Sequence, residues 1–308
     1  MHRIVITEFM DQAAVDRLAT GDATLYAPDL ADRQGDIPAL LATAEALIVR
    51  NRTQVTAALL DAAPGLRVVG RLGVGLDNID QDACRARDVA VIPATGANDD
   101  AVAEYVITAA LILLRGAWHD SAAVAAGHWP RQRLIGRELG GKRLGLLGFG
   151  AIARKTARLG QALGMAVTAH DPFLTPGDPA WGSVRSVDIE TLFATADVLS
   201  LHVPLSAETR HVVDAARLSQ MPDGSVLINA ARGGVVDETA LAAALGKGRP
   251  SGAALDVFEE EPLSAGAGAR FEGLNVLLTP HIAGVTAESN VRVSDKIADD
   301  VLAVLNGQ

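Results

Sequence analysis

The stretch Lys142-Arg-Leu-Gly-Leu-Leu-Gly148-Phe-Gly150-Ala-Ile-Ala153 lies near the middle of the 308-residue chain. It joins an apolar run to residues that favour a helix, and its small residues follow the glycine pattern of dinucleotide-binding βαβ units. Gly148 permits a tight turn, Gly150 lets a pyrophosphate approach backbone amides, and Ala153 is small enough for the helix to pack closely on the strand. The pattern therefore predicts a dinucleotide site in which the phosphates lie at the helix N-terminus.

A second apolar run, residues 165–169, ends at His170 and Asp171. Such units keep a ribose-binding acid about 20 residues beyond the glycine turn, and Asp171 has this position. A carboxylate about 4 Å from a ribose 2′-phosphate would cost on the order of 4 kcal/mol at an effective dielectric constant of about 20, and Pro172-Phe173 supply no compensating arginine. We therefore expect NAD rather than NADP, although an aspartate before a proline can also simply form a turn.

Composition excludes several classes of function. The formal charge of −10 argues against a nucleic-acid or anionic-membrane partner, because both need a basic stripe. A single cysteine, Cys84, excludes an intramolecular disulfide framework, and no His/Cys cluster has metal-ligand spacing, so no metal site is expected. Glu8 interrupts the first apolar run before the core of a signal peptide could form, which predicts a cytoplasmic protein.

The length of the chain favours two domains. Short apolar runs alternate with alanine-rich segments, which is typical of open parallel α/β sheets. Strands are expected at residues 4–6, 46–49, 67–69 and 89–92, and then at 143–147, 165–169, 198–201, 225–229, 252–255 and 276–278. The later six match the six-stranded sheet of dinucleotide-binding domains.

Three further segments complete the expected organisation. A helix over residues 98–116 is apolar nearly all round, so we expect it to be buried between domains or between subunits. Residues 117–141 lack periodicity and are expected to form an irregular arm. A last helix over residues 287–305 is expected to return to the N-terminal domain.

Three polar residues follow the ends of successive apolar runs in the second half: Arg232, Glu261 and His281. In a parallel sheet these ends line the ligand crevice. Imidazole can give or take a proton near neutral pH, a neighbouring carboxylate favours its charged form, and a guanidinium neutralises charge developing on oxygen. These residue types suit a reaction in which a proton moves to or from an oxygen on which negative charge develops.

Ordered motifs extend this pattern over nearly the whole chain: residues 69–80, the glycine pattern, and residues 229–237, 252–262 and 279–284. On these motifs the chain resembles the D-isomer-specific 2-hydroxyacid dehydrogenases, the family that includes phosphoglycerate dehydrogenase. The resemblance implies a flavodoxin-like substrate domain of residues 1–96 and 283–308, with a Rossmann-like NAD-binding domain of residues 97–282 inserted in it, both with doubly wound parallel sheets. It also implies a homodimer joined through the inserted domain, and no regulatory domain of the kind carried by longer phosphoglycerate dehydrogenases.

The same resemblance implies residue roles. Arg232 binds the carboxylate and carbonyl of the substrate, His281 is the general acid/base, Glu261 orients and charges that histidine, and Asp256 binds the nicotinamide amide. The implied cofactor-binding residues are Gly148, Phe149, Gly150, Ala151, Ile152, Asp171, His202, Pro204, Thr209, Ala230, Arg232, Asp256, His281 and Ala283. The implied substrate-binding residues are Arg50, Asn51, Gly73, Val74, Gly75, Asn98, Arg232 and His281, with the backbone amides of Val74 and Gly75 receiving the carboxylate.

The loop Arg50-Asn51-Arg52 is the best indication of the substrate. In phosphoglycerate dehydrogenases the matching stretch meets the phosphate, so the loop suggests a 2-hydroxy acid with a second anionic group, a phosphate, sulfonate or carboxylate. Asp100 stands where some of those enzymes have another arginine, which weakens the phosphate interpretation and leaves 3-sulfolactate beside 3-phosphoglycerate. Both loop arginines can also be plain surface residues.

Other functions remain compatible with the sequence. Glyoxylate/hydroxypyruvate reductase is one alternative, and a non-catalytic NAD-binding corepressor of the same fold is another, because a fold does not fix a function. Formate dehydrogenases resemble this pattern but carry glutamine in place of Glu261, so the glutamate favours hydroxyacid chemistry.

Overall fold

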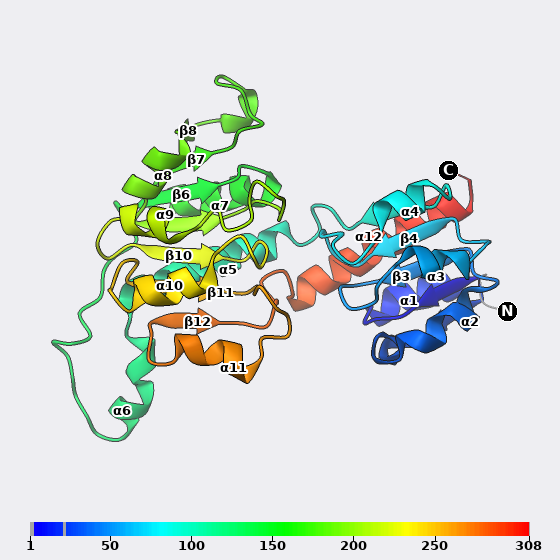
Figure 1. Ribbon diagram of the computed structural model, residues 1–308, viewed down its shortest axis with the longest axis horizontal. Coiled ribbons are helices and arrows are strands. Elements are labelled where there is room, and N and C mark those ends of the chain that lie inside the picture. The colour runs from blue at the N-terminus through cyan, green and yellow to red at the C-terminus, as the bar shows by residue number, and fades with distance from the viewer. Residues whose placement is uncertain (1–2, 21–22, 308) are drawn as a thin grey trace. The chain divides into compact units, whose positions relative to one another are not determined.

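The computed structural model describes residues 3–20 and 23–307, and the chain forms two compact units (Figure 1). Unit 1 comprises Met1–Asn98 and Val285–Gln308, and unit 2 comprises Asp99–Gly284. Unit 2 is thus inserted into unit 1. The assignment of substrate and NAD to domains with the boundaries given above stays a prediction.

Unit 1 is built on a five-stranded parallel sheet. Its strands are β1 (Ile4–Ile6), β2 (Thr24–Tyr26), β3 (Ala46–Val49), β4 (Val68–Arg71) and β5 (Ala90–Pro93), in the order β2-β1-β3-β4-β5. This is the flavodoxin-like order. Its helices are α1 (Gln12–Ala19), α2 (Ile37–Leu41), α3 (Ala57–Asp61), α4 (Gln81–Arg85) and α12 (Ala287–Leu305), with 3₁₀ turns at Pro28–Asp32 and Gln34–Asp36.

The last helix, α12, completes unit 1, as the sequence predicted. It begins with a capping box, in which the Thr286 side chain accepts a hydrogen bond from the Ser289 amide and the Ser289 side chain accepts one from the Thr286 amide. Its buried face joins the core of β1 and α1. A Cβ on Gly70 of β4 would lie 2.8 Å from Ile297 and 2.9 Å from Val301, so α12 packs directly on bare backbone.

Unit 2 is built on a seven-stranded parallel sheet. Its strands are β6 (Arg143–Leu147), β7 (Ala166–His170), β8 (Arg185–Ser186), β9 (Val198–Leu201), β10 (Val226–Asn229), β11 (Gly252–Leu255) and β12 (Val276–Leu278). The order β12-β11-β10-β9-β6-β7-β8 is the dinucleotide-binding order with one more strand at the β12 edge. We expected six strands in this sheet and did not expect β8, which is only two residues long. Strand order reverses between β6 and β9, and ligands bind outside the strand ends at such a point.

Helices cover both faces of this sheet (Figure 1). On one face lie α5 (Asp99–Arg115) and α7 (Ala151–Ala162), and on the other lie α8 (Ile189–Thr195), α9 (Ala215–Gln220) and α10 (Glu238–Leu245). Shorter elements are α6 (Ser121–Ala125), α11 (Ala265–Gly268) and 3₁₀ turns at Trp118–Asp120, Pro179–Trp181 and Ala269–Phe271. No helix in the described part of the chain is long and apolar enough to cross a membrane.

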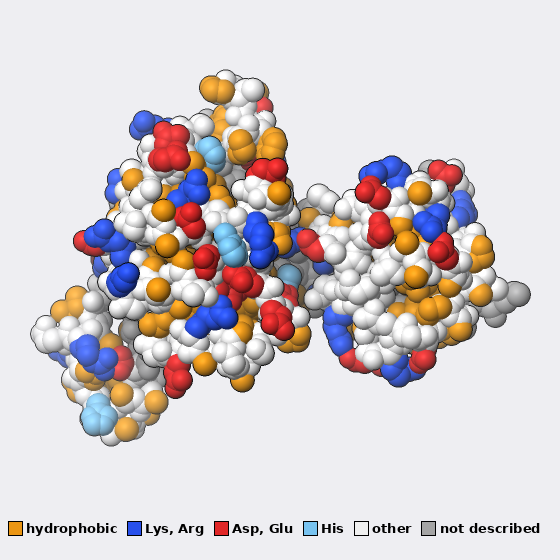
Figure 2. Space-filling view, in the orientation of Figure 1, with side chains coloured by type: hydrophobic (Ala, Val, Ile, Leu, Met, Phe, Trp, Pro, Cys, Tyr) orange, Lys and Arg blue, Asp and Glu red, His pale blue; other side chains and the backbone are white. Residues whose placement is uncertain are grey.

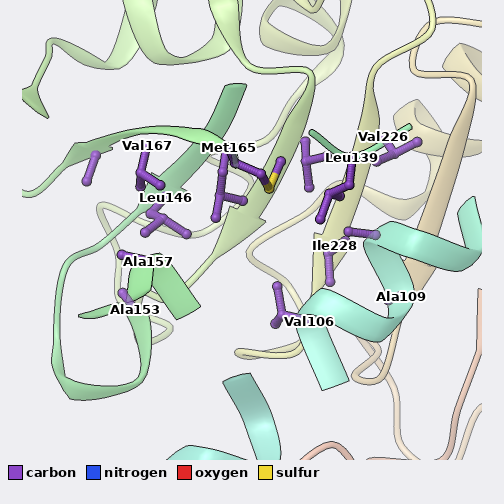
Figure 3. Packing of buried hydrophobic residues seen from close by; sticks show 14 of the residues in the cluster. Val106, Ala109, Leu139, Leu146, Ala153, Ala157, Met165, Val167, Val226 and Ile228 are labelled. Atoms are coloured by element: carbon purple, nitrogen blue, oxygen red, sulfur yellow. The ribbon is translucent and has the colours of Figure 1, made fainter. Parts of the chain in front are cut away.

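Helix α5 packs largely within unit 2. We expected it to be buried between domains or between subunits; one side of it belongs to the core of unit 2, while Leu111 is 41% exposed, so burial of that side between subunits stays a prediction. Val106 and Ala109 lie in one cluster with Ile228 of β10 and Ala157 of α7 (Figure 3). The helix is apolar nearly all round because α7 and the sheet cover it from two sides.

The sequence predicted an irregular arm over residues 117–141. Residues 117–136 form it, mostly irregular but with the short helix α6, whereas Leu139 already belongs to the core of unit 2. The arm projects from the rest of unit 2 in Figure 1, and Figure 2 shows hydrophobic side chains on its surface. Four of its large apolar side chains are exposed: Trp118 by 61%, Val124 by 40%, Trp129 by 75% and Ile135 by 74%.

Candidate active site

The glycine turn connects β6 to α7 at the point where strand order reverses. Gly148 has a φ of +88°, and a Cβ there would lie 2.5 Å from the carbonyl oxygen of His202, so only glycine fits. Helix α7 begins at Ala151, and its N-cap, Gly150, supplies no side-chain hydrogen bond to the amides of the first turn. A Cβ on Gly150 would meet no atom within 4 Å. The first-turn amides are therefore open to an anion.

Asp171 lies directly beyond β7 and is held against this turn. One of its carboxylate oxygens accepts a hydrogen bond from the amide of Phe149 at 2.8 Å, and the other accepts one from the amide of Phe173 at 2.9 Å. It lines a cavity of about 420 Å³ together with Arg185 and Asp188, a volume typical of small-ligand pockets. The open helix terminus, the cradle at Gly148 and the carboxylate in the cavity fit the pyrophosphate and adenosine ribose of NAD.

The other cofactor positions follow the ends of neighbouring strands. His202, Pro204 and Thr209 lie beyond β9, and the Thr209 hydroxyl donates to the Pro204 carbonyl at 2.6 Å, which closes that loop. Burial lowers the pKa of His202 to about 4, so this histidine is neutral at physiological pH. Its Nε2 lies 3.0 Å from the Ser200 hydroxyl. Ala230 directly follows β10.

The candidate acid/base pair joins the loops that follow β11 and β12. His281 Nδ1 lies 2.8 Å from Glu261 Oε2, and 38% of the His281 side chain and 33% of the Glu261 side chain are exposed. Burial would raise the pKa of Glu261, but hydrogen bonds from His281 and the Phe258 amide and the positive charges of His281 and Arg232 together lower it. An ionised carboxylate only accepts, so Nδ1 carries a proton and Nε2 is the nitrogen left for a substrate.

Arg232 lies on the turn that follows β10. The buried last residue of this strand, Asn229, fixes the conformation of the turn. Asn229 donates to the Arg232 carbonyl at 3.0 Å and accepts from the Ala231 amide at 3.1 Å. The next residue, Gly233, packs against the loop that carries Glu261, because a Cβ there would lie 1.6 Å from the Phe258 carbonyl oxygen. Within unit 2 the structure thus brings together all three residues that the sequence placed at strand ends.

Asp256 has a role that the sequence reasoning missed. It is 1% exposed, and its carboxylate accepts hydrogen bonds from the Thr279 hydroxyl at 2.6 Å, the Ile282 amide at 2.8 Å and the Ala283 amide at 2.7 Å. Its carbonyl accepts from the amide of His281 at 2.8 Å. These bonds hold His281 at a φ of +56°, a backbone conformation that few residues other than glycine adopt.

Tyr105 of α5 extends this anchor and was also missed. Its hydroxyl lies 2.6 Å from that of Thr279, which must donate to Asp256 and therefore accepts from Tyr105. In the sequence, the available indication of this anchor was Asp256, an acid directly after the buried strand β11. We assigned it to the cofactor alone.

The predicted substrate residues of unit 1 also follow strand ends. Gly73, with a φ of +150°, Val74 and Gly75 lie beyond β4, and Arg71 Nη1 occupies the place where a Cβ on Gly73 would stand. The Oδ1 atom of Asn98 is buried with no hydrogen-bond partner among the described residues.

The two arginines of the loop beyond β3 have different surroundings. Arg50 is half-buried, whereas Arg52 is exposed and forms an ion pair with Asp32. Asn51 is exposed as well. Arg52 thus has an anionic partner already, whereas Arg50 does not pair with a carboxylate among the described residues; that this loop holds a distal anion stays a prediction.

Comparison with known proteins places this geometry in a family. The chain is 53% identical over 307 residues to the (S)-sulfolactate dehydrogenase of Chromohalobacter salexigens, and the match covers 99% of both chains. It is 39% identical over 263 residues to a D-3-phosphoglycerate dehydrogenase of Archaeoglobus fulgidus, with 85% of this chain covered but only 50% of that relative's length. A D-lactate dehydrogenase of Aquifex aeolicus, solved with NAD and lactic acid, matches with a TM-score of 0.86 at 28% identity, covering 99% of this chain and 96% of that chain.

The family model that matches is the NAD-binding domain of the D-isomer-specific 2-hydroxyacid dehydrogenases, over residues 107–283. That match covers the glycine turn, Asp171 and the three candidate catalytic residues, Arg232, Glu261 and His281. The chain therefore belongs to the D-isomer-specific 2-hydroxyacid dehydrogenase family, and it is an oxidoreductase whose cofactor is NAD.

Proposed function

We propose that the protein interconverts a small 2-hydroxy acid that carries a second anionic group, of the 3-sulfolactate or 3-phosphoglycerate type, with its 2-keto acid. The observation that carries the chemistry is the 2.8 Å pair between His281 Nδ1 and Glu261 Oε2. The sulfolactate dehydrogenase that is 53% identical over the full chain supports the substrate class, as does the half-buried Arg50.

Each candidate residue has its own role in the reaction. Arg232 binds the substrate carboxylate and carbonyl, and its positive charge stabilises the negative charge that develops on the carbonyl oxygen. The backbone amides of Val74 and Gly75 receive the carboxylate. NAD, when bound, supplies or accepts the hydride.

The proton moves through His281. In the reducing direction Nε2 of the imidazolium gives its proton to the carbonyl oxygen, and in the oxidising direction neutral Nε2 takes the hydroxyl proton. Glu261, whose pKa is lowered, remains ionised at neutral pH, so it accepts from Nδ1 throughout and stabilises the imidazolium. Both directions therefore use the same nitrogen.

A substrate panel tests the distal anion. We expect NADH oxidation with sulfopyruvate or phosphohydroxypyruvate to exceed that with glyoxylate, hydroxypyruvate and 2-ketobutyrate in kcat/KM. Arg50→Ala is expected to cost roughly 2–5 kcal/mol with the dianionic acids, the range for truncating one member of a buried charge pair, and little with the monoanionic ones.

Arg52→Ala is the matched control, because it removes an equal charge from the same loop but from an exposed ion pair. Equal losses of Arg50→Ala on both classes of acid would exclude the distal-anion role. A preference of the wild type for glyoxylate or hydroxypyruvate would favour the reductase alternative. Activity on none of the acids, despite NADH binding, would favour the corepressor.

A homodimer and a cytoplasmic location belong to the same proposal. The buried free thiol of Cys84 suits a reducing compartment. The arm supports dimerisation, because side chains as large and exposed as Trp118 and Trp129 are typical of surfaces that another protein covers.

We expect sedimentation to give twice the chain mass of 31.9 kDa for the wild type and a lower mass for Trp129→Glu. Phe173→Glu is the control, because Phe173 is 91% exposed but lies outside the arm. A wild-type monomer, or a Trp129→Glu dimer as stable as the control, would contradict this use of the arm.

A further inference from the structure

The loop beyond β3 presents its backbone amides to a buried carboxylate. Glu8, which is 4% exposed, accepts hydrogen bonds from the amides of Arg50 at 2.8 Å, Asn51 at 3.3 Å, Arg52 at 3.1 Å and Thr53 at 2.9 Å. These donors point into unit 1 and are already used. An anion that binds at this loop must therefore be held by a side chain.

The Arg50 guanidinium is the positively charged group of this loop that is available to hold an anion. Burial lowers its pKa and the charge of Glu8 opposes this only in part, so the cation is poorly solvated. No carboxylate of the described residues forms an ion pair with it, whereas Arg52 in the same loop pairs with Asp32. The hydrogen-bond partner of Arg50 is instead neutral: Nη2 donates to Asn290 Oδ1 at 2.9 Å.

Asn290 belongs to the first turn of α12, whose N-cap is Thr286. A guanidinium has only donors, so the amide oxygen must face Arg50, and the orientation of the Asn290 side chain is fixed. The positive end of the α12 dipole lies at this turn, which disfavours a second cation and favours an anion. The acid in the same turn, Glu288, forms no ion pair with Arg50 among the described residues.

We propose that Asn290 is a specificity-determining residue, which positions Arg50 through a neutral hydrogen bond and leaves the guanidinium charge for the distal phosphate, sulfonate or carboxylate of the substrate. This inference rests on the proposed function. A carboxylate of the same shape would hold Arg50 equally well but would neutralise it and repel a second anion. Choice between dianionic and monoanionic acids would then depend on the charge at position 290 rather than on Arg50 alone.

Asn290→Asp is the decisive variant, because it changes the charge and keeps the shape. We expect kcat/KM with sulfopyruvate to fall roughly 10- to 100-fold, the range for losing a hydrogen bond to a charged group, chiefly through a higher KM. With glyoxylate kcat/KM should change less than about threefold. Asn306→Asp, at the exposed C-cap of the same helix, adds an equal charge at a distance and should alter neither substrate.

A second measurement does not depend on turnover. Inorganic sulfate should raise the melting temperature of the wild type and of Asn306→Asp, and it should raise that of Asn290→Asp and Arg50→Ala markedly less. Equal loss of activity on both substrates, or a sulfate response of Asn290→Asp like that of the wild type, would overturn the inference. If no acid is reduced by the wild type, the proposed function fails while the sulfate measurement still decides the role of Asn290.

Discussion

Replacement of His281 by alanine is expected to lower kcat by about 10²- to 10⁴-fold, the contribution of a general acid/base, while NADH binding stays close to that of the wild type. The imidazole is held on one side by Glu261 at 2.8 Å, so the variant removes the proton donor but leaves Asp171, the glycine turn and Arg232 in place. Stopped-flow turnover and fluorescence titration with NADH measure the two effects separately.

Two further variants make this result specific. His281→Asn removes the acid/base group but keeps a residue that tolerates the φ of +56°, so its loss of turnover cannot be assigned to backbone strain. His211→Ala is the matched control, because His211 also has a positive φ and lies 3.2 Å from a glutamate of the same loop, Glu259. Turnover by His281→Asn within tenfold of that by His211→Ala would remove His281 from the mechanism.

Gly233→Ala is expected to lower kcat/KM by about 10²-fold or more, although no side chain of the active site is changed. The added methyl would lie 1.6 Å from the carbonyl oxygen of Phe258 and 2.2 Å from its carbon, and backbone atoms cannot yield as a flexible side chain does. The loop that carries Glu261 must shift away from Arg232, and a displacement of about 1 Å can cost this much. Overpacking should also cost about 1–3 kcal/mol of stability.

The control for this variant is Gly266→Ala in α11 of the same unit. A Cβ there meets no atom within 4 Å, and the backbone is helical, so a neutral or slightly stabilising effect is expected. Thermal unfolding and steady-state kinetics distinguish a misplaced loop from an unfolded unit. Wild-type kcat/KM in Gly233→Ala would show that the position of the Phe258 loop does not matter for catalysis.

Much of the fold followed from local patterns in the sequence. Strands β1, β3 and β9 have the predicted bounds because each is a buried, mostly apolar run between polar breaks, and so does β6, although its first residue, Arg143, is exposed. The two strands that the sequence did not indicate lie at sheet edges: β2 is partly exposed, and β8 is a pair of exposed polar residues. Their pairing depends on a neighbour already in place, so no periodicity marks them.

The residues of the active site also differ in whether the sequence could indicate their roles. Arg232, Glu261 and His281 were predictable because parallel topology brings the ends of strands that are distant in sequence to one edge. The anchoring roles of Asp256, which we had assigned to the cofactor, and of Glu8 were not predictable, because a carboxylate after a buried strand has no visible partner until the fold is closed. Glu8 meets amides 42 to 45 residues away, and Asp256 meets those of a loop 26 and 27 residues away.

The insertion of unit 2 within unit 1 has a consequence for how the protein is made. Synthesis delivers the five strands of unit 1 first, but the helix that covers Gly70 comes roughly 190 residues later, which takes about 10 to 40 s at typical ribosomal rates. During that interval one face of the nascent sheet, including Ile4 and Ile6, is without the helix that later buries it. We expect this apolar face to stay accessible to other chains and to chaperones until the last helix leaves the ribosome.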